Sequence, residues 1–174
     1  GLFRGAGADL IRSGIHIGSC PFGNEDEANM RKSLGVSESS ALVGMVACLK
    51  PQKAPLDFVE LAARVRNEIP DVRFLLVGDG DLKPDVERLV HMLGLERTVM
   101  LTGWRRDIPE ILNALDVFVL TSRWEGLPRV VLEALAAGTP VVATAVDGTV
   151  EALERIADGT RGYLVAPGDL VTMA

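Results

Sequence analysis

From residue 41 onward, the apolar positions follow two alternating patterns. Short runs in which nearly every residue is apolar alternate with longer segments in which apolar residues recur every three or four positions. The short runs predict buried β-strands, and the longer segments predict amphipathic helices. The predicted strands are 41–49, 72–78, 98–103, 116–122, 140–145 and 161–166, and the predicted helices are 55–69, 83–94, 108–115, 127–138 and 149–157.

This alternation predicts an α/β fold. Strands that are apolar on both faces and separated by single helices are typical of parallel βαβ units with right-handed crossovers. Pro84 and Pro128 stand near the expected starts of two helices, and Gly94 and Gly138 at their expected ends. The prediction is a doubly wound, open, parallel sheet of the Rossmann-like kind, with about six strands.

The first 40 residues lie outside this rhythm. They predict an irregular segment, a short helix at about 26–34 and a polar loop rich in Ser and Glu. The final "PGDLVTMA" stops where another helix would begin. We therefore expect 1–40 to be an entry or linker segment from a preceding domain. We expect 41–174 to be one domain, truncated at both ends relative to the full protein.

Composition narrows the class of protein. The 174 residues suit one compact domain, and the 48% hydrophobic content fits strands covered on both faces. The 18 Lys and Arg against 24 Asp and Glu give a net charge of −6, the opposite of the basic balance that nucleic-acid binding favours. No apolar stretch is long enough for a membrane span, and no secretory signal is visible, so we expect a cytoplasmic protein.

Cysteine and histidine argue against a metal site. Cys20 and Cys48 have no disulfide framework or metal-ligand spacing, and Cys48, inside an apolar run, is expected to be reduced and buried. His16 and His91 are the chain's two histidines, and His91 is expected to be structural. We predict no tightly held transition metal.

Candidate chemistry is expected where the strands end, because open parallel sheets bind ligands beyond the carboxyl ends of their strands. Four unusual turns follow predicted strands: "KPQKAP", "GDGDLKP", "GWRRD" and "SRWEGLP". In the second turn, Gly78 and Gly80 permit either a tight turn or contact with a ligand. The third position of a dinucleotide fingerprint is Lys83, so that fingerprint is incomplete, and the plain turn is favoured.

Lys53 stands just before a predicted helix, where the helix dipole disfavours a cation. The same geometry attracts anions, so Lys53 and the free N–H groups of the helix could form a phosphate site. A solvated surface lysine is an equal alternative at this point.

Glu125 and Glu133 lie eight positions apart around the corner Gly126-Leu127-Pro128. Glu125 could simply stabilise the helix N-terminus, and Glu133 could pair with Arg129 one turn earlier. Alternatively, the two acids bracket a ligand rich in hydroxyls, with the amides of Gly126 and Leu127 facing its phosphates. Spacing alone leaves both interpretations open.

The segment "DVFVLTSRWEGLPRVVLEALAAGTPVVAT" (116–144) closely resembles the Glu-x7-Glu block of the C-terminal, donor-binding domain of retaining GT-B glycosyltransferases of the group 1 type. "VACLKPQKAP" resembles that family's first phosphate loop, "LLVGDGDL" its second turn and "GWRRDIPEIL" its third. The resemblance extends from "SGIHIG" (13–18) to "GYLVAPGD" (162–169).

The resemblance implies a role for each candidate residue toward a nucleotide-sugar donor. Lys53 would neutralise the diphosphate, and Glu125 would lie toward the sugar, the two being the expected catalytic residues. Glu133 would accept hydrogen bonds from the ribose hydroxyls. The remaining expected binding residues are Gly126, Leu127 and Pro128 at the diphosphate or sugar, Trp104 and Arg105 beside the base, and Gly78 and Gly80.

The resemblance also implies transfer of a hexose-type sugar with retention of configuration, from a UDP-sugar more than a GDP-sugar, without an obligatory metal or cofactor. The family's acceptor-binding N-terminal domain is absent from this chain, so we expect the chain alone to bind a donor weakly and to transfer nothing. Any peripheral membrane contact is expected to go through that other domain.

The sequence departs from the family at three positions. Cys48 stands where the family often has Arg as a second phosphate cation, Ala54 where it often has Gly, and His16 where Asp is frequent. Lys53 would then carry more of the leaving-group stabilisation, with Arg123 or Arg129 as possible helpers. The alternatives are a non-catalytic nucleotide-binding or interaction module and a GT-B nucleotide-sugar epimerase. A nicotinamide-binding Rossmann domain is a weaker alternative because GxGxxG is missing.

Overall fold

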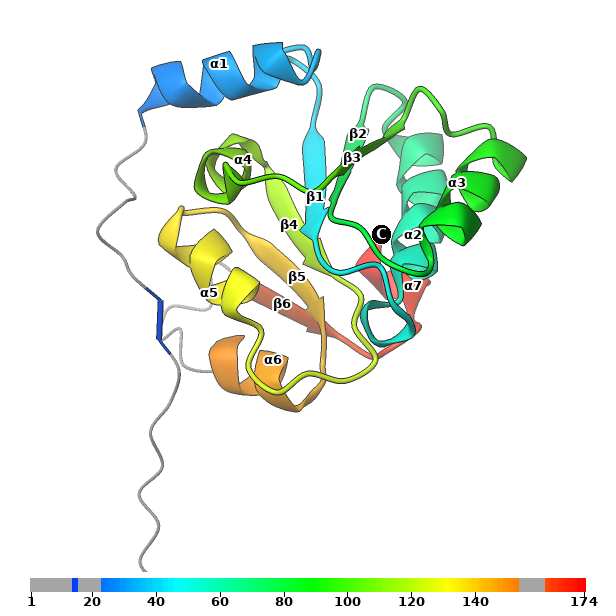
Figure 1. Cartoon of the computed structure of the whole chain (residues 1–174), viewed down its shortest axis with the longest axis vertical. Helices are drawn as coiled ribbons and strands as arrows, with labels where there is room; N and C mark the ends of the chain where they lie inside the picture. The colour runs from blue at the N-terminus through cyan, green and yellow to red at the C-terminus, as the bar shows by residue number, and fades with distance from the viewer. Residues whose placement is uncertain (1–13, 16–22, 154–161) are drawn as a thin grey trace, which may run out of the picture.

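The computed structural model describes residues 14–15, 23–153 and 162–174. Within these residues, six parallel strands form one sheet in the order β3-β2-β1-β4-β5-β6 (Figure 1). This architecture confirms the predicted Rossmann-like α/β fold. The strands are β1 Leu42–Val46, β2 Arg73–Val77, β3 Val99–Gly103, β4 Val117–Leu120, β5 Val141–Thr144 and β6 Gly162–Val165.

Helices cover both faces of the sheet. In Figure 1, α2, α3 and α7 lie on one side, and α4, α5 and α6 lie on the other. The described helices are α1 Asn24–Ser33, α2 Pro55–Glu68, α3 Lys83–Met92, α4 Ile108–Ala114, α5 Arg129–Ala136, α6 Asp147–Leu153 and α7 Leu170–Met173, with a 3-10 turn η1 at Pro51–Lys53. Covering on both faces explains why the strands are apolar throughout.

The core lies between the sheet and these helices. Phe58 of α2 and Phe74 of β2 meet edge to face, with ring centroids 5.3 Å apart, and Phe118 of β4 is fully buried. Gly44 of β1 makes room for Leu115, because a Cβ at Gly44 would lie 2.4 Å from a Leu115 methyl carbon. The central strands are therefore fixed by close packing on both faces.

The strand order places a switch point between β1 and β4. Chain connections run outward from β1 to β2 and β3 on one side, and from β4 to β5 and β6 on the other. The loops that follow β1 and β4 consequently emerge side by side at the carboxyl edge of the sheet, which is where sheets of this kind bind ligands.

The element ends agree with the sequence patterns to within a few residues. Gly94 and Gly138 follow α3 and α5 with φ of 61° and 86°, the left-handed conformation expected of a glycine at that position. The predicted strand 116–122 ends at Leu120. Thr121 then bonds the loop after β1, and Ser122 bonds Glu125 in its own loop. The turn η1 was not predicted. Residues His16, Cys20 and 154–157, for which elements or roles were expected, lie outside the described residues.

Helix α1 is tied to the sheet although it precedes the βα rhythm. It packs on α4, and its Arg31 is buried with the guanidinium 2.6 Å from Asp116 Oδ2 and 2.9 Å from the Ser40 carbonyl oxygen. Asp116 Oδ2 also accepts the main-chain N–H of Leu42, at 2.7 Å. One carboxylate thus joins α1 to the starts of β1 and β4.

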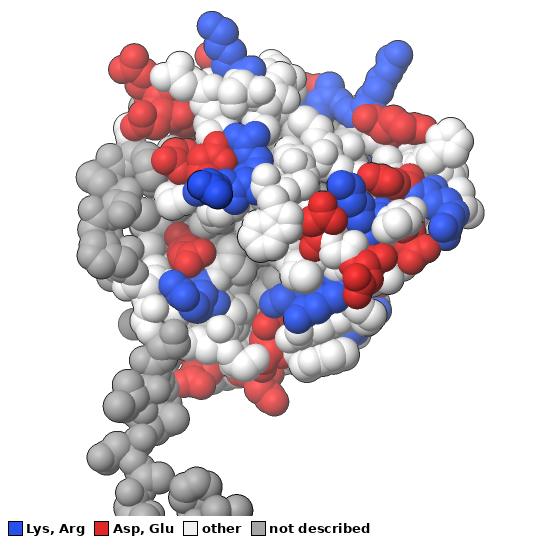
Figure 2. Space-filling model, in the orientation of Figure 1, with Lys and Arg blue, Asp and Glu red and all other residues white. Residues whose placement is uncertain are grey.

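On the face that Figure 2 shows, the described Lys and Arg side chains are interspersed with Asp and Glu. Such a mixed surface differs from the basic stripe that nucleic-acid binding requires. Of the helices in the described part of the chain, none combines the length and the hydropathy needed to cross a bilayer.

Candidate functional site

Lys53 ends the turn η1 in the loop between β1 and α2. The next residue, Ala54, has φ 45° and ψ 54°, and among the described residues it is the one non-glycine with positive φ. An L-residue in this left-handed conformation costs about 1–2 kcal/mol. This explains why a glycine would suit position 54. The neighbouring structure must hold Ala54 in place.

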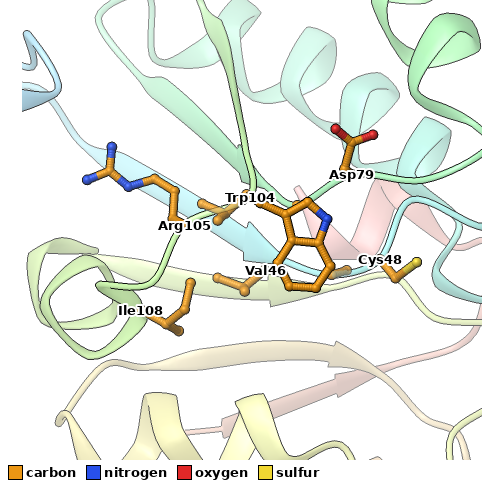
Figure 3. A pocket seen from close by; sticks show the side chains of 9 residues that line it. Val46, Cys48, Asp79, Trp104, Arg105 and Ile108 are labelled. Carbon is orange, nitrogen blue, oxygen red and sulfur yellow. The ribbon is translucent and has the colours of Figure 1, made fainter.

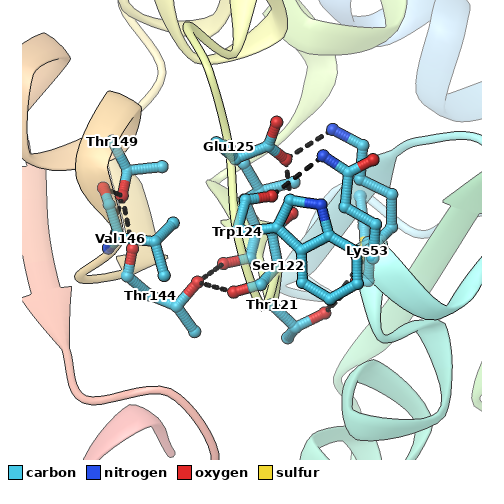
Figure 4. A network of polar contacts seen from close by, with 11 residues as sticks. Lys53, Thr121, Ser122, Trp124, Glu125, Thr144, Val146 and Thr149 are labelled. Carbon is cyan, nitrogen blue, oxygen red and sulfur yellow. Dashed lines mark hydrogen bonds and ion pairs between the residues drawn. The ribbon is translucent and has the colours of Figure 1, made fainter.

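The loop after β4 holds Ala54 in this conformation through hydrogen bonds (Figure 4). The buried Thr121 hydroxyl lies 2.9 Å from the Lys53 carbonyl oxygen and 3.0 Å from that of Ala54. The main-chain N–H of Arg123 donates to the Gln52 carbonyl at 2.8 Å, and the Gln52 amide donates to the Trp124 carbonyl at 2.9 Å. Two segments about 70 residues apart in sequence are thereby fastened together.

Lys53 and Glu125 form an ion pair across these two segments. Their side chains are 17% and 6% exposed, so water screens the pair less than it would at the surface. The Ser122 hydroxyl donates at 2.5 Å to the same carboxylate oxygen, Oε1, that receives the lysine. The structure thus brings together the two residues expected to be catalytic.

A cavity of about 200 Å³ opens at the same carboxyl edge of the sheet, and neither Lys53 nor Glu125 is among the residues that line it. It lies among the ends of β1, β2 and β3, and the indole of Trp104 stands over it (Figure 3). Trp104 is 82% exposed, so most of its ring surface is free for contact with a ligand. The lining residues are Val46, Ala47, Cys48, Val77, Gly78, Asp79, Trp104, Arg105 and Ile108.

Gly78 and Gly80 have left-handed φ values of 132° and 157°. A Cβ at Gly78 would lie 1.9 Å from the Ala47 carbonyl oxygen, and one at Gly80 would lie 2.5 Å from that of Leu49. Both glycines therefore permit the loop after β2 to press against the loop after β1, as the turn interpretation requires. Gly78 also lines the cavity.

Asp79 places a negative charge at the cavity. The main-chain N–H of Gly80, 2.8 Å from Oδ1, and the Lys83 side chain lower the pKa of Asp79. Asp79 is therefore ionised at neutral pH. A carboxylate here favours a neutral part of a ligand over a phosphate.

Arg105 is held by Asp107 in a short side-chain contact on the loop between β3 and α4. This hydrogen bonding raises the pKa of Arg105 and lowers that of Asp107. In Figure 3 the guanidinium points away from the Trp104 ring, so the part of Arg105 nearer the cavity is its stem.

Gly126, Leu127 and Pro128 form the corner that leads into α5, with Pro128 as the N-cap. The start of α6 presses against this corner, because a Cβ at Gly148 would lie 1.7 Å from the Gly126 carbonyl oxygen. Glu133 lies one turn into α5 with its side chain 36% exposed, 4.0 Å from Arg129. It is not among the residues that line the cavity.

The expectation that Cys48 is buried was wrong. Cys48 is exposed and lines the cavity, because it lies beyond the end of β1 at Val46, whereas the next residue, Leu49, is buried.

Arg123 and Arg129, the two residues expected to help Lys53, each contact an acid of the protein. Arg123 lies 2.7 Å from Asp57, and Arg129 faces Glu133. Burial raises the pKa of Asp57, although the charge of Arg123 opposes this rise.

Sequence reasoning missed a set of buried hydroxyls that hold the site. The Thr144 hydroxyl donates to the Ser122 carbonyl at 2.5 Å, and that of Thr149 donates to the Thr144 carbonyl. Thr121 and Ser122 follow β4, Thr144 ends β5 and Thr149 lies in α6, so the available signal, hydroxyl residues at the end of an apolar run, covers the first three.

The fold and these loops define a Rossmann-like α/β domain whose candidate binding loops, after β1 and β4, meet at the switch point of the sheet. A family model described as "Glycosyl transferases group 1" matches residues 40–174, and the chain belongs to this family. The resemblance noted in the sequence is thereby confirmed.

Individual relatives agree with this membership. The chain is 44% identical over 120 residues to a UDP-Gal:alpha-D-GlcNAc-diphosphoundecaprenol alpha-1,3-galactosyltransferase of Escherichia coli, a match that covers 67% of this chain and 31% of that protein. The Anabaena protein Alr3699/HepE, solved in complex with UDP-glucose, superposes with a TM-score of 0.86 at 31% identity, over 95% of this chain and 45% of that one. This chain therefore spans less than half the length of either relative.

A third likeness is to a domain solved alone. The C-terminal domain of a group 1 family glycosyl transferase of Francisella tularensis superposes with a TM-score of 0.79 at 25% identity. The match covers 92% of this chain and 84% of that one.

Proposed function

We propose that this chain is the donor-binding domain of a glycosyltransferase that transfers a hexose from a UDP-sugar with retention of configuration. The observation that carries the proposal is the pairing of Lys53 with Glu125, next to the corner before α5, at the switch point of a sheet whose carboxyl edge also holds the cavity under Trp104. The names of two relatives, one a UDP-galactose-dependent transferase and one a complex with UDP-glucose, support UDP over GDP.

The cavity fits the base of such a donor. Pockets that enclose a whole drug-sized ligand measure about 300–1,000 Å³, and the cavity here is about 200 Å³. This volume suits one flat heterocycle, with the rest of the donor lying outside. The exposed Trp104 ring offers a stacking surface, and the ionised Asp79 directs the phosphates elsewhere.

Lys53 is the proposed partner of the diphosphate. When the bond between the anomeric carbon and the diphosphate oxygen breaks, its electron pair stays on that oxygen, and the sugar develops oxocarbenium character. A fixed ammonium and the N–H groups of the corner Gly126-Leu127-Pro128, where Pro128 contributes no donor, stabilise the growing charge. Glu125 would face the sugar and Glu133 the ribose.

We propose that the acceptor is bound by an N-terminal domain outside this chain, as the greater length of the relatives suggests. This chain alone then binds a donor weakly and transfers nothing. Retention rests on the family resemblance. Proton NMR of the product made by the full-length protein tests it, and an inverted anomeric configuration would exclude it.

Thermal unfolding of this chain with nucleotide sugars tests donor binding. A donor at ten times its Kd adds about 1.4 kcal/mol of stability, and we expect UDP-glucose or UDP-galactose at that level to raise Tm by about 3–6 °C. GDP-mannose at the same concentration should raise it less. Equal shifts would reject the preference for UDP, and no shift with any of the three at 10-fold higher concentration would reject the donor-binding role.

A further inference from the structure

Two consecutive hydroxyl side chains follow the last residue of β4 and are almost fully buried, with Thr121 1% and Ser122 0% exposed. A buried hydroxyl requires a hydrogen-bond partner. The partners of these two lie on opposite members of the Lys53–Glu125 ion pair.

Thr121 fixes the lysine side of the pair through the main chain. Its hydroxyl lies within hydrogen-bond distance of the carbonyls of Lys53 and Ala54, where the backbone takes its unfavourable left-handed turn. Without this bond the turn at Ala54 is free to relax, and the direction in which Lys53 leaves the loop changes.

Ser122 fixes the acid side of the pair through the carboxylate. Its hydroxyl and the Lys53 ammonium both donate to Glu125 Oε1. The position of Ser122 is itself set by the Thr144 hydroxyl, which donates to its carbonyl, so the orientation of Glu125 depends on the ends of two adjacent strands (Figure 4).

We infer that Thr121 and Ser122 are positioning residues for donor binding, with Thr121 setting the cation that meets the diphosphate and Ser122 setting the carboxylate that meets the sugar. The inference rests on the proposed function. Each residue acts through one charged neighbour, so the loss of each hydroxyl affects a different part of the donor.

Three ligands of increasing size separate these effects. Uridine carries the base and ribose, UDP adds the diphosphate, and UDP-glucose adds the sugar. We expect Thr121→Val to weaken UDP and UDP-glucose by about 3- to 10-fold, with uridine unchanged. We expect Ser122→Ala to weaken UDP-glucose by about 3- to 10-fold while UDP binds at least as tightly as before. Isothermal titration calorimetry or NMR titration measures the affinity of each ligand for the wild-type chain and for each of the two variants.

Matched variants exclude a general loss of stability. Thr139 is buried and its hydroxyl donates to the Leu112 carbonyl at 2.6 Å, near the amino end of β5. Thr139→Val should lower Tm and leave the three affinities unchanged. Thr121→Ser, which keeps the hydroxyl, should retain wild-type affinity for UDP. Thr121→Ala serves as the test variant if Thr121→Val does not fold.

A loss that is equal for uridine, UDP and UDP-glucose, or no loss at all, would overturn the inference while the proposed function stands. If the folded wild-type chain binds none of the three ligands, the proposed function fails and the inference fails with it.

Discussion

The charges of Lys53 and Glu125 neutralise each other in the ion pair. An anion that binds Lys53 must therefore compete with the Glu125 carboxylate. At an effective dielectric constant of about 20, two unit charges 4 Å apart attract by about 4 kcal/mol. A diphosphate carries more than one negative charge, so it competes for the lysine on favourable terms. The Lys53 side chain is 17% exposed, so solvent reaches part of it in the folded protein.

The first prediction concerns this ammonium. Lys53→Met keeps the length of the side chain and removes its charge, which leaves Glu125 without its ion-pair partner. Because charge-assisted hydrogen bonds contribute about 1.5–3 kcal/mol, we expect the affinity for UDP to fall by about 10- to 150-fold. Uridine should bind as before, as measured by calorimetry.

Lys32→Met, at an exposed position of α1, is the matched control and should leave both affinities unchanged. If Lys53→Met leaves the affinity for UDP unaltered, Lys53 is a structural partner of Glu125 and nothing more.

At the scale of elements, the strand-to-helix loops are built with more strain and more buried polar contacts than the helices that follow them. The start of α2 shows this, because Ala54 caps the helix in a left-handed conformation, with Pro55 as the first helical residue. The loop after β4 compensates with the Thr121 hydrogen bonds.

The second prediction compares substitutions of Ala54. A β-branched side chain is strained at positive φ and also overfills a buried site, so Ala54→Val should lower the free energy of unfolding by at least about 2 kcal/mol. Ala54→Gly removes the strain but also a buried methyl group, and it gives the unfolded chain more freedom, so its effect should stay within about 1 kcal/mol.

Ala62→Val, in the middle of α2, separates the two causes because Ala62 is fully buried in a helical conformation. We expect it to cost less than Ala54→Val in urea unfolding. Equal costs would mean that crowding, not backbone strain, governs position 54.

The third prediction concerns the attachment of α1. Arg31 has a side chain that is 5% exposed, whereas that of Asp116 is 50% exposed. Removing the acid leaves a buried guanidinium that still contacts Glu27 and the Ser40 carbonyl, and it also leaves the Leu42 N–H without this acceptor. Removing the arginine leaves a carboxylate that water can solvate.

We therefore expect Asp116→Ala to lower the free energy of unfolding by about 2–3 kcal/mol and Arg31→Met by about 1–2 kcal/mol. The double variant should cost less than the sum of the two. The opposite order in chemical denaturation would show that the ion pair does not anchor α1.

At the scale of the whole molecule, stability depends on carboxylates that are hydrogen-bonded in the folded state. The pKa values of Asp79, Glu96, Asp107 and Asp169 are lowered by hydrogen bonds, to which Lys83, His91, Arg105 and Thr172 contribute respectively. A group whose folded pKa is lowered stabilises the fold above its unfolded pKa and loses that effect as the pH falls through the folded pKa.

The fourth prediction is a loss of stability below about pH 4, near the unfolded pKa of a carboxylate. Asp57 acts in the opposite direction because burial raises its pKa, and it offsets part of this loss. Asp107→Asn should make the dependence on pH shallower between about pH 2 and 4. Urea unfolding across this range measures the slope, and an identical slope in the variant would contradict the assignment to Asp107.

The molecule also shows what a sequence pattern can predict. Periodicity identified most of the strands and helices and the parallel direction of the strands, because each element buries an apolar face. Lys53 and Glu125 were found because their chemistry is conspicuous at the end of a strand. Their contact with each other could not be predicted, since it depends on how the loops after β1 and β4 meet in space.

The buried hydroxyl residues were missed for a different reason. Thr121, Ser122, Thr144 and Thr149 are short polar residues that the sequence patterns place at the ends of predicted strands or, for Thr149, at the start of a predicted helix. Their importance comes from burial and from partners on other segments. Cys48 was misjudged for a related reason, because an apolar run does not reveal where its strand stops.

The most direct test of the account is a crystal structure of this chain with UDP-glucose. The account predicts the uracil ring in the cavity under Trp104 and Lys53 Nζ within about 2.7–3.2 Å of a diphosphate oxygen, with the corner Gly126-Leu127 facing the same diphosphate. A donor bound at another edge of the sheet, or a diphosphate that Lys53 does not reach, would contradict it.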